Sequence, residues 1–450
     1  MVMRRWWRAA FADDVLRRLL RNVTYLFSAN MLAALIGLLT LAVMARALGP
    51  AELGVIALIE AYARSVDRLF RFEPGAAVVR YGTLALEAGR KDDFRRLIKF
   101  STLFDLFGAS LAALVAVGGA RIAASWLDLD EEQTLMAMWF SATLVFALSS
   151  TPTAVLRLFD KFSLIARLLV SLALARFLLT LVAWQFGGDL WSFVIILMLY
   201  QVAEQMTTTA FAWLELRRQR YHDVWRLSLR GLMAENPGLP GFVWNSNISV
   251  IARISTHRFD TLILGALLNP AAAGLYQLAK RTGIAAMRLG RPIQQAVLPE
   301  AARLWARGEV SRFRLIVLRV NGVMGAIGGL AFVVAAFYMD LLVRLAFGEA
   351  FAAAAPLVTV QVLAVTLFLA GNTFNPALLS MGADRSLIRV TLTATLVFFA
   401  AFVPLVHLFG PLGASLSHVL FNLTWLTGCL AVFLRRTRPP GTRPATGVPD

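Results

Sequence analysis

Apolar runs of about 20 residues recur from one end of this 450-residue chain to the other. Each run is long enough to cross the roughly 30 Å hydrocarbon core of a membrane as a helix. The alternation of apolar and polar residues that marks outer-membrane β-barrels is absent. Because 58% of the residues are hydrophobic and only 16% are charged, we predict an all-α polytopic membrane protein.

The turn that closes the first apolar run is repeated later in the chain. The sequence LGPAELG, which ends at Gly54, returns as LNPAAAG, which ends at Gly274, so that Pro270 corresponds to Pro50. Proline fixes the turn, and the glycine four residues later lets the next helix begin close to its neighbour. The pattern predicts a tight hairpin between two membrane spans at both places.

Three further matches follow at nearly the same displacement. GRKDDFRRLI from Gly89 returns as GEVSRFRLIV from Gly308, PTAVLRLFDKF from Pro152 returns as PALLSMGADRS from Pro376, and the Phe-Gly turn at 186–187 returns at 409–410. Shared alanine and leucine content does not explain four matches in order. A displacement near 220 residues predicts two homologous halves, as in many transporters.

We expect twelve transmembrane helices, six in each half, forming two homologous six-helix bundles. The predicted parts are a cytoplasmic interfacial amphipathic helix at 1–22, an N-terminal lobe at 23–214, a cytoplasmic linker at 215–241, a C-terminal lobe at 242–434 and a disordered cytoplasmic tail at 435–450. Lysine and arginine concentrate in the terminal segments and in alternate loops, whereas the other loops hold only Arg46, Arg121 and Arg344. The positive-inside rule therefore places both termini in the cytoplasm.

Several function classes find no support in the sequence. The net charge of +17 is explained by positive-inside bias and intramembrane arginines, so no nucleic-acid partner is predicted. Cys429 is the only cysteine and the four histidines are dispersed, which leaves no predicted disulfide, metal site or cofactor. The nucleotide-binding and metalloprotease motifs are absent too, and we expect a protein that is not an enzyme.

Ionisable residues within membrane spans are costly and by default face an interior cavity. On helical geometry, the charged residues of predicted spans two, seven and eight each fall on one face. The three faces comprise Glu60, Arg64, Asp67, Arg68 and Arg71 in span two, Arg253, His257 and Asp260 in span seven, and Gln277, Lys280, Arg281, Arg288, Arg291 and Gln295 in span eight. By contrast, Arg176, Glu204 and Arg319 are expected to stand alone in their spans.

Two interpretations of these charges stay open. Arginines near the cytoplasmic ends of spans can reach lipid phosphates, and Glu60 with Arg64 can form a structural ion pair. Residues that only reach toward lipid need not share a face over three turns, however. Because cations outnumber carboxylates in the three spans, a cavity between the halves would be positive and suited to an anionic head group, which arginine can bind through two parallel hydrogen bonds.

Three segments resemble a known family. They are ARALGPAELG after the first span, FDTLILGALLNPAAAGLYQLAKR across predicted spans seven and eight, and FGEAFAAAAPL before span ten. They resemble Wzx-type O-antigen and exopolysaccharide flippases of the multidrug/oligosaccharidyl-lipid/polysaccharide exporter superfamily. The resemblance implies a MATE-like fold in a bacterial inner membrane and transport of a lipid-linked oligosaccharide of the polyprenyl-pyrophosphate type to the periplasmic leaflet.

Together these observations predict a flippase that works by alternating access. The residues expected to bind the pyrophosphate–sugar head are Arg64, Arg253, Lys280, Arg281, Arg288 and Arg291, and the candidates for ion coupling are Asp67, Glu204 and Asp260. The expected partners are the lipid-linked oligosaccharide, membrane lipids and a polysaccharide polymerase. Two alternatives remain: a multidrug exporter of the same superfamily, which would need an acidic cavity, and a membrane glycan polymerase, which would need a large periplasmic loop.

Overall fold

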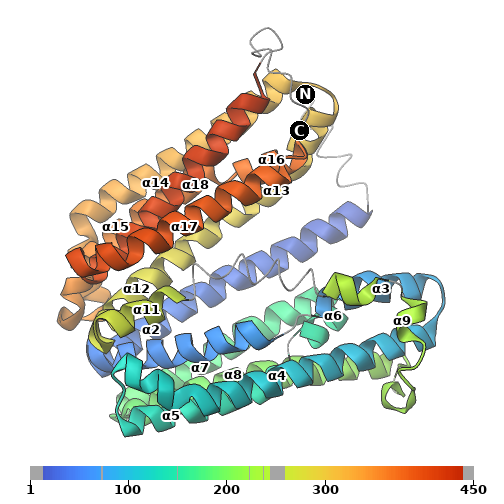
Figure 1. Ribbon diagram of the computed structural model, residues 1–450, viewed down its shortest axis with the longest axis horizontal. Coiled ribbons are helices and arrows are strands. Elements are labelled where there is room, and N and C mark those ends of the chain that lie inside the picture. Colours follow the sequence, from blue (N-terminus) through green and yellow to red (C-terminus); the bar gives the residue numbers. More distant parts are fainter. Residues whose placement is uncertain are drawn as a thin grey trace. The chain divides into compact units, whose positions relative to one another are not determined.

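The computed structural model describes residues 14–71, 74–148, 150–221, 223–236, 238–243 and 259–438. Within these ranges every regular element is a helix (Figure 1), which confirms the predicted all-α fold. The chain divides into two compact units, unit 1 at 1–271 and unit 2 at 272–450. Each unit has its own helical packing and is described separately.

Nine helices in the described ranges are long and apolar enough to cross a membrane. The predicted count of twelve is therefore approximate, for three reasons. The first of the nine, Thr24–Phe70, contains both of the first two predicted spans, and predicted span seven lies partly outside the described residues. Predicted span eight carries Lys280, Arg281, Arg288 and Arg291 and is not one of the nine.

The helix α2 (Asp14–Phe70) is bent where the sequence predicts a turn. Gly49 has φ 72° and ψ −179°, a left-handed conformation that glycine adopts at little cost, and Pro50 begins the second arm. The bend therefore lies at the residue directly before the proline that was predicted to fix the turn. The matching proline, Pro270, likewise opens the helix α12 (Pro270–Met287). The interfacial helix predicted at 1–22 is described only from Asp14, where α2 continues into the first span without a break.

The remaining helices of unit 1 follow in chain order. They are α3 (Gly75–Glu87), α4 (Lys91–Leu127), α5 (Glu131–Ala142), η1 (Thr143–Phe146), α6 (Ser150–Leu158), α7 (Phe162–Gln185), α8 (Leu190–Arg218), η2 (Val224–Arg226), α9 (Leu232–Glu235) and α11 (Phe259–Leu267). The segment predicted as the fourth span is thus broken, because η1 ends before α6 begins.

The predicted linker at 215–241 lies against unit 1. Arg96 on α4 forms an ion pair with Glu235 on α9, and Nζ of Lys99 donates to the Trp225 and Leu227 carbonyls at 2.9 and 2.7 Å. Buried apolar side chains join α3, α4 and the linker in one cluster. The described part of this segment is therefore a docked element of the unit.

Helix α11 also belongs to unit 1, where it packs on α2 and α4. Gly265 makes the approach to α2 possible, because a Cβ at this position would overlap the side chain of Leu58. Along the chain, the boundary between the two units consequently lies after Ala271, whereas the predicted lobe boundary lies within 215–241. The predicted bounds of the two lobes stay a prediction. The two boundaries differ because α11 packs within unit 1.

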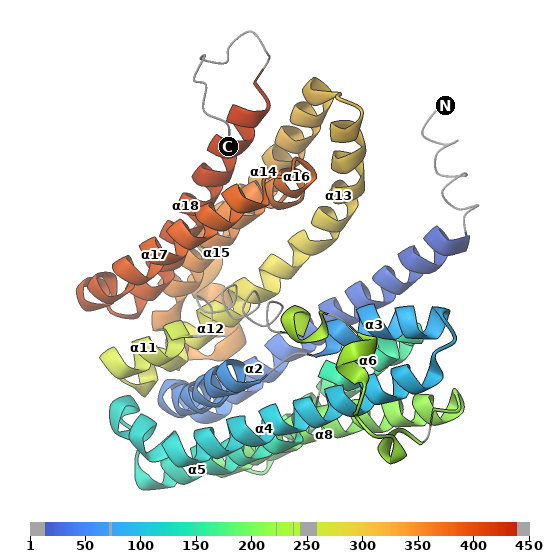
Figure 2. The same ribbon diagram turned by 45° about the vertical axis from the view of Figure 1, so that its right-hand side comes forward.

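Unit 2 continues from α12 with a second set of helices. They are η4 (Arg288–Gly290), α13 (Arg291–Ala306), α14 (Val310–Phe347), η5 (Glu349–Ala354), α15 (Ala355–Gly371), α16 (Phe374–Ser380), α17 (Asp384–Phe409) and α18 (Pro411–Arg436). Helix α15 packs against α14 and α18, and α17 packs against α18 (Figure 2). The disordered tail predicted at 435–450 is described only to residue 438, and α18 includes its first two residues.

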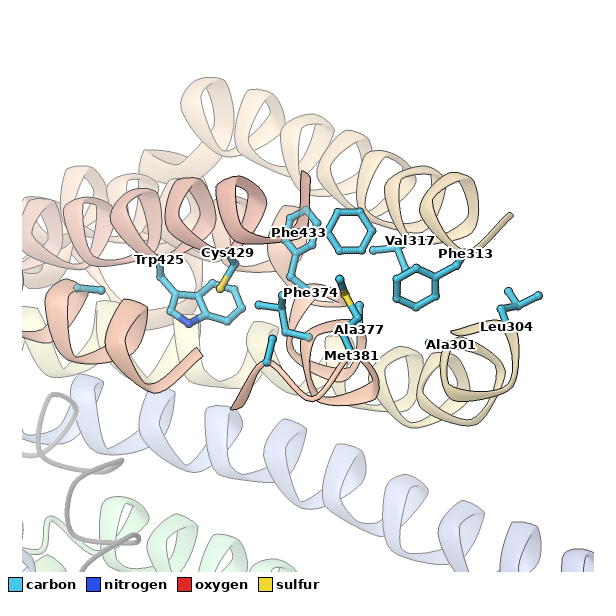
Figure 3. Close-up of a cluster of buried hydrophobic side chains, with 13 residues drawn as sticks. Ala301, Leu304, Phe313, Val317, Phe374, Ala377, Met381, Trp425, Cys429 and Phe433 are labelled. Carbon is cyan, nitrogen blue, oxygen red and sulfur yellow. The ribbon is translucent and has the colours of Figure 1, made fainter. Parts of the chain in front are cut away.

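The core of unit 2 is aromatic at the end where α14, α16 and α18 meet. The rings of Phe313 and Phe433 lie 5.6 Å apart, and those of Phe374 and Phe433 lie 5.3 Å apart. Figure 3 shows these rings beside Cys429 and Met381 in one buried cluster. Close aromatic packing of this kind fixes the angles between helices, because ring shapes tolerate little sliding.

Candidate functional site

Unit 1 gathers five polar side chains from three helices into what we call the charged cluster: Glu60 and Arg64 of α2, Arg176 of α7, and Tyr200 and Glu204 of α8. Nη2 of Arg64 donates to Oε1 of Glu60 at 3.0 Å, one turn away on the same helix. The guanidinium of Arg176 lies 5.2 Å from the Tyr200 ring centroid, within range for a cation–π contact. Packing of α2 against α7, and of α7 against α8, brings these residues together.

Glu204 lies between the two contacts of the charged cluster, the Glu60–Arg64 pair and the Arg176–Tyr200 pair. It interacts electrostatically with both Arg64 and Arg176, and Tyr200 lies one helical turn before it on α8. The carboxylate of Glu60 is buried, whereas the side chain of Arg64 is 48% exposed at the surface of unit 1. The cluster thus holds its carboxylates within the unit and presents one guanidinium outward, which suits contact with an anion.

This arrangement corrects one prediction from the sequence. Arg176 and Glu204 were expected to stand alone in spans five and six, but they lie in the same cluster as Arg64. Periodicity within single helices cannot find such a set, because its members come from three spans. The available signal was the rule that an intramembrane ion needs a partner, applied between spans instead of within one.

The predicted coupling residues other than Glu204 lie elsewhere in unit 1. Asp67 accepts hydrogen bonds from Nε of Arg71 at 2.9 Å and pairs with its Nη2 at 2.7 Å. Asp260, on α11, is fully buried and accepts a hydrogen bond from the backbone amide of Thr261 at 2.7 Å. Arg253 and His257 lie outside the described residues, so the predicted face of span seven is described only at Asp260.

In unit 2, Lys280 and Arg281 lie side by side in sequence on α12 but differ in surroundings. Lys280 is buried, with Nζ 5.9 Å from the centroid of the Tyr276 ring. Arg281 is partly buried. When the Gln277 amide oxygen faces it, that oxygen accepts from Nε and Nη2 of Arg281 at 2.9 and 3.2 Å. Of the predicted stripe, Gln277 and Arg281 therefore lie within hydrogen-bonding distance of each other, whereas Lys280 lies beside Tyr276.

The predicted stripe on span eight does not continue on one regular helix. α12 ends at Met287, the 3₁₀ turn η4 contains Arg288, and α13 begins at Arg291. The assumption of 100° per residue from Gln277 to Gln295 is therefore wrong beyond Met287. Glycine and proline in the sequence RLGRP explain the interruption, since both weaken a helix interior.

A second polar contact in unit 2 was missed from the sequence. The Tyr276 hydroxyl and Nε2 of His418 lie 2.8 Å apart, and both residues are buried. Phe398 packs on the His418 ring at 5.0 Å between centroids. From the sequence, His418 was only one of four dispersed histidines, and the structure gives it a packed, hydrogen-bonded environment.

Comparison with known proteins shows which family this chain resembles. The family model described as "Polysaccharide biosynthesis protein" matches residues 43–356. The inner membrane protein YghQ of Escherichia coli (strain K12) is 30% identical over 341 residues, which cover 75% of this chain and 95% of that protein. The predicted resemblance to a polysaccharide-export family is confirmed at this level.

Solved structures show the same fold at low sequence identity. The lipid II flippase MurJ in an inward closed conformation superposes with a TM-score of 0.68 at 11% identity, covering 92% of this chain and 90% of that one. An inward-facing multidrug resistance MATE family transporter gives a TM-score of 0.64 at 14% identity, covering 92% and 93%. The predicted MATE-like architecture is therefore confirmed.

Proposed function

Because the chain belongs to the polysaccharide biosynthesis protein family, we propose that it is a flippase that moves a lipid-linked oligosaccharide across the bacterial inner membrane. The charged cluster of unit 1 carries the proposal, since it presents Arg64 at the surface while Glu60 stays buried. A fold shared with a lipid II flippase supports the same reading. The transported head would be a polyprenyl-pyrophosphate oligosaccharide destined for O-antigen or exopolysaccharide.

The chemistry of the head group motivates the assignment of cations. A pyrophosphate carries several anionic oxygens, and arginine holds such oxygens through two parallel, charge-assisted hydrogen bonds. We assign this contact to Arg64 in unit 1 and to Lys280, Arg281, Arg288, Arg253 and Arg291 of the second half. A site for a cationic drug would need the opposite balance of charge, which makes multidrug export the weaker alternative.

The direction and driving force form part of the same proposal. From the loop charges we infer that both termini lie in the cytoplasm. We further propose that transport runs from the cytoplasmic to the periplasmic leaflet by alternating access. Glu204 is the leading coupling candidate because it lies among two guanidiniums and a tyrosine. Asp67 and Asp260 remain candidates, and a polysaccharide polymerase remains the expected downstream partner.

Complementation of an export-deficient strain tests the proposal. Arg64→Ala should reduce exported polysaccharide by at least about tenfold, the effect of losing one strong charge-assisted contact, and lipid-linked precursor should accumulate. Arg64→Lys should restore export only in part, because an ammonium lacks the planar fork. Arg312→Ala is the matched control, since Arg312 is exposed beside Glu309 at the start of α14.

Membrane levels of each variant must be measured beside export. Normal export from Arg64→Ala at normal membrane level would remove Arg64 from the binding site. Normal export from Arg64→Ala, Arg281→Ala and Arg288→Ala alike would leave the cationic binding of a pyrophosphate without support. If the variants lose drug resistance and keep normal polysaccharide export, multidrug export would be favoured.

A further inference from the structure

Two membrane segments, one in each unit, are interrupted and then restart as a short helix. In unit 1, η1 ends at Phe146 and α6 begins at Ser150. In unit 2, α15 ends at Gly371 and α16 begins at Phe374. Interrupted spans expose backbone groups at membrane depth, and in transporters such groups often surround an ion or substrate.

Each restart is held by one side chain from the long helix that precedes the broken segment. In unit 1, Oδ2 of Asp105 on α4 accepts from the backbone amide of Thr151 at 2.7 Å. In unit 2, Oδ1 of Asn321 on α14 accepts from the amide of Thr373 at 3.0 Å and from its hydroxyl at 2.7 Å. The same device therefore uses a carboxylate in one unit and a neutral amide in the other.

The residues around the two caps also differ, and those beside Asp105 are more polar than those beside Asn321. Ser101, one helical turn before Asp105 on α4, is fully buried, and Thr151 is nearly so. The hydroxyls of Ser101 and Thr151 have no hydrogen-bond partner within the described part of the chain. In unit 2 the residue one turn before Asn321 is the apolar Val317, which is fully buried.

The cap of unit 2 has an amide where unit 1 has the carboxylate of Asp105, and a valine where unit 1 has the hydroxyl of Ser101. The Thr373 hydroxyl is already donated to Asn321, and the buried atoms of this cap that have no partner in the described ranges are Nδ2 of Asn321 and Oδ1 of Asn372, both from neutral amides. An amide nitrogen donates and does not bind a cation. In unit 1 the corresponding atoms are hydroxyl oxygens beside a carboxylate, a hard oxygen donor set.

We propose that Asp105, Ser101 and Thr151 form a binding site for a small monovalent cation, Na⁺, at the broken fourth span. Asp105 supplies the compensating charge in addition to its other contacts, the two hydroxyls supply neutral oxygens, and water completes the shell. A cation there fastens α4 to the start of α6. Its use to drive transport rests on the proposed flippase function, whereas binding itself does not.

The test measures Na⁺ binding on the purified full-length protein in detergent, without any lipid-linked glycan. Thermal unfolding is followed while choline chloride is replaced by NaCl at constant ionic strength, with KCl as a second series. The wild-type midpoint should rise with Na⁺ and saturate, because a ligand that binds only the folded state stabilises it. Potassium and choline should give a much smaller rise.

Three variants separate the site from general effects. Asp105→Asn keeps an acceptor for the Thr151 amide but removes the charge, and Ser101→Ala and Thr151→Val each remove one hydroxyl. Each should raise the apparent Na⁺ dissociation constant by at least about tenfold, as lost metal-site partners commonly do. Ser141→Ala is the matched control, because the Ser141 hydroxyl on α5 is also buried and lacks a partner in the described residues.

The outcomes decide the proposal independently of glycan transport. A wild-type midpoint that does not respond to Na⁺, or responds equally to K⁺ and choline, overturns it. So does an unchanged Na⁺ response in Asp105→Asn, or a response that appears only on acidification. If Asp105→Asn does not fold, an unchanged Na⁺ response in the Ser101→Ala/Thr151→Val double variant overturns it. Loss of the response in the site variants with its retention in Ser141→Ala supports it, whatever the export assay shows.

Discussion

The seating of α11 on α2 allows a sharp test of the packing in unit 1. Substituting Gly265→Ala adds one Cβ that would lie 3.1 Å from Cδ1 and 3.3 Å from Cγ of Leu58, and closer still to Cδ2. Ordinary contacts between carbon atoms are about 3.5–4.0 Å. Leu58 is fully buried, so its side chain has no open space into which it can turn.

The magnitude follows from the overlap. Adding a methyl group to a packed interior commonly costs about 1–3 kcal/mol, and we expect the free energy of unfolding to fall by this amount in Gly265→Ala. Leu58→Ala alone should cost about 2–5 kcal/mol through lost burial and the cavity left behind. Because all three crowded atoms belong to the part of Leu58 that this change removes, the double variant should be scarcely less stable than Leu58→Ala.

The assay is a double-mutant cycle in detergent, with unfolding followed by tryptophan fluorescence. Gly37→Ala on α2 is the control, since a Cβ placed there would have no atom within 4 Å beyond its chain neighbours and the nearby backbone of its own helix. That variant should be neutral or more stable by up to about 1 kcal/mol, the helix preference of alanine over glycine. If Gly265→Ala behaves like Gly37→Ala, or if the two effects simply add, α11 does not pack on α2 at Leu58.

Three further predictions concern other parts of the fold. Hydrogen bonds from Ser192, in the first turn of α8, hold the pKa of Asp189 below its usual value. The stability that Asp189 contributes is therefore present above the pKa of the unfolded state and is lost as the pH falls through the pKa of the folded state. Thermal unfolding of Asp189→Asn over an acidic pH series should not show that loss. Tyr276→Phe removes the 2.8 Å contact with His418 and should cost about 1 kcal/mol in the same unfolding assay; an unchanged midpoint would contradict it. Phe313→Ala should cost about 3–5 kcal/mol, whereas Phe337→Ala, 79% exposed on α14, should cost far less, and equal costs would contradict the core assignment.

The features predicted well from the sequence are those that depend on residues close together in the chain. Apolar runs gave the spans, and the repeated proline turn marked two helix starts, at Pro50 and Pro270. The break within the fourth span was not predicted, because the residue that caps the new helix comes from another span. The break after α15 lies where predicted span ten ends, at Asn372. Asp105 was nevertheless visible as the only ionisable residue of predicted span three at 100–120.

Only those contacts of the site that lie within a single helix could be predicted from the sequence. Glu60 and Arg64 are one turn apart, so their pairing follows from helical spacing. The contacts of Arg176 with Tyr200 and of Tyr276 with His418 join different helices. Such pairs depend on how helices cross, which a single sequence does not encode in any local pattern. The face of span eight failed for a related reason, since its helix is interrupted at Arg288.

The place of α11 in unit 1 has a consequence for how the protein is made. Chains emerge from the ribosome N-terminus first, and compact units tend to fold as they are completed. Unit 1 cannot close until residue 271 has been synthesised, well after α8 has entered the membrane, because α11 is among its parts. Until then α2 and α4 expose the surface that α11 will cover. A chain severed in the 215–241 segment would leave α11 on the other fragment, so co-expressed halves cut there must reassemble through it.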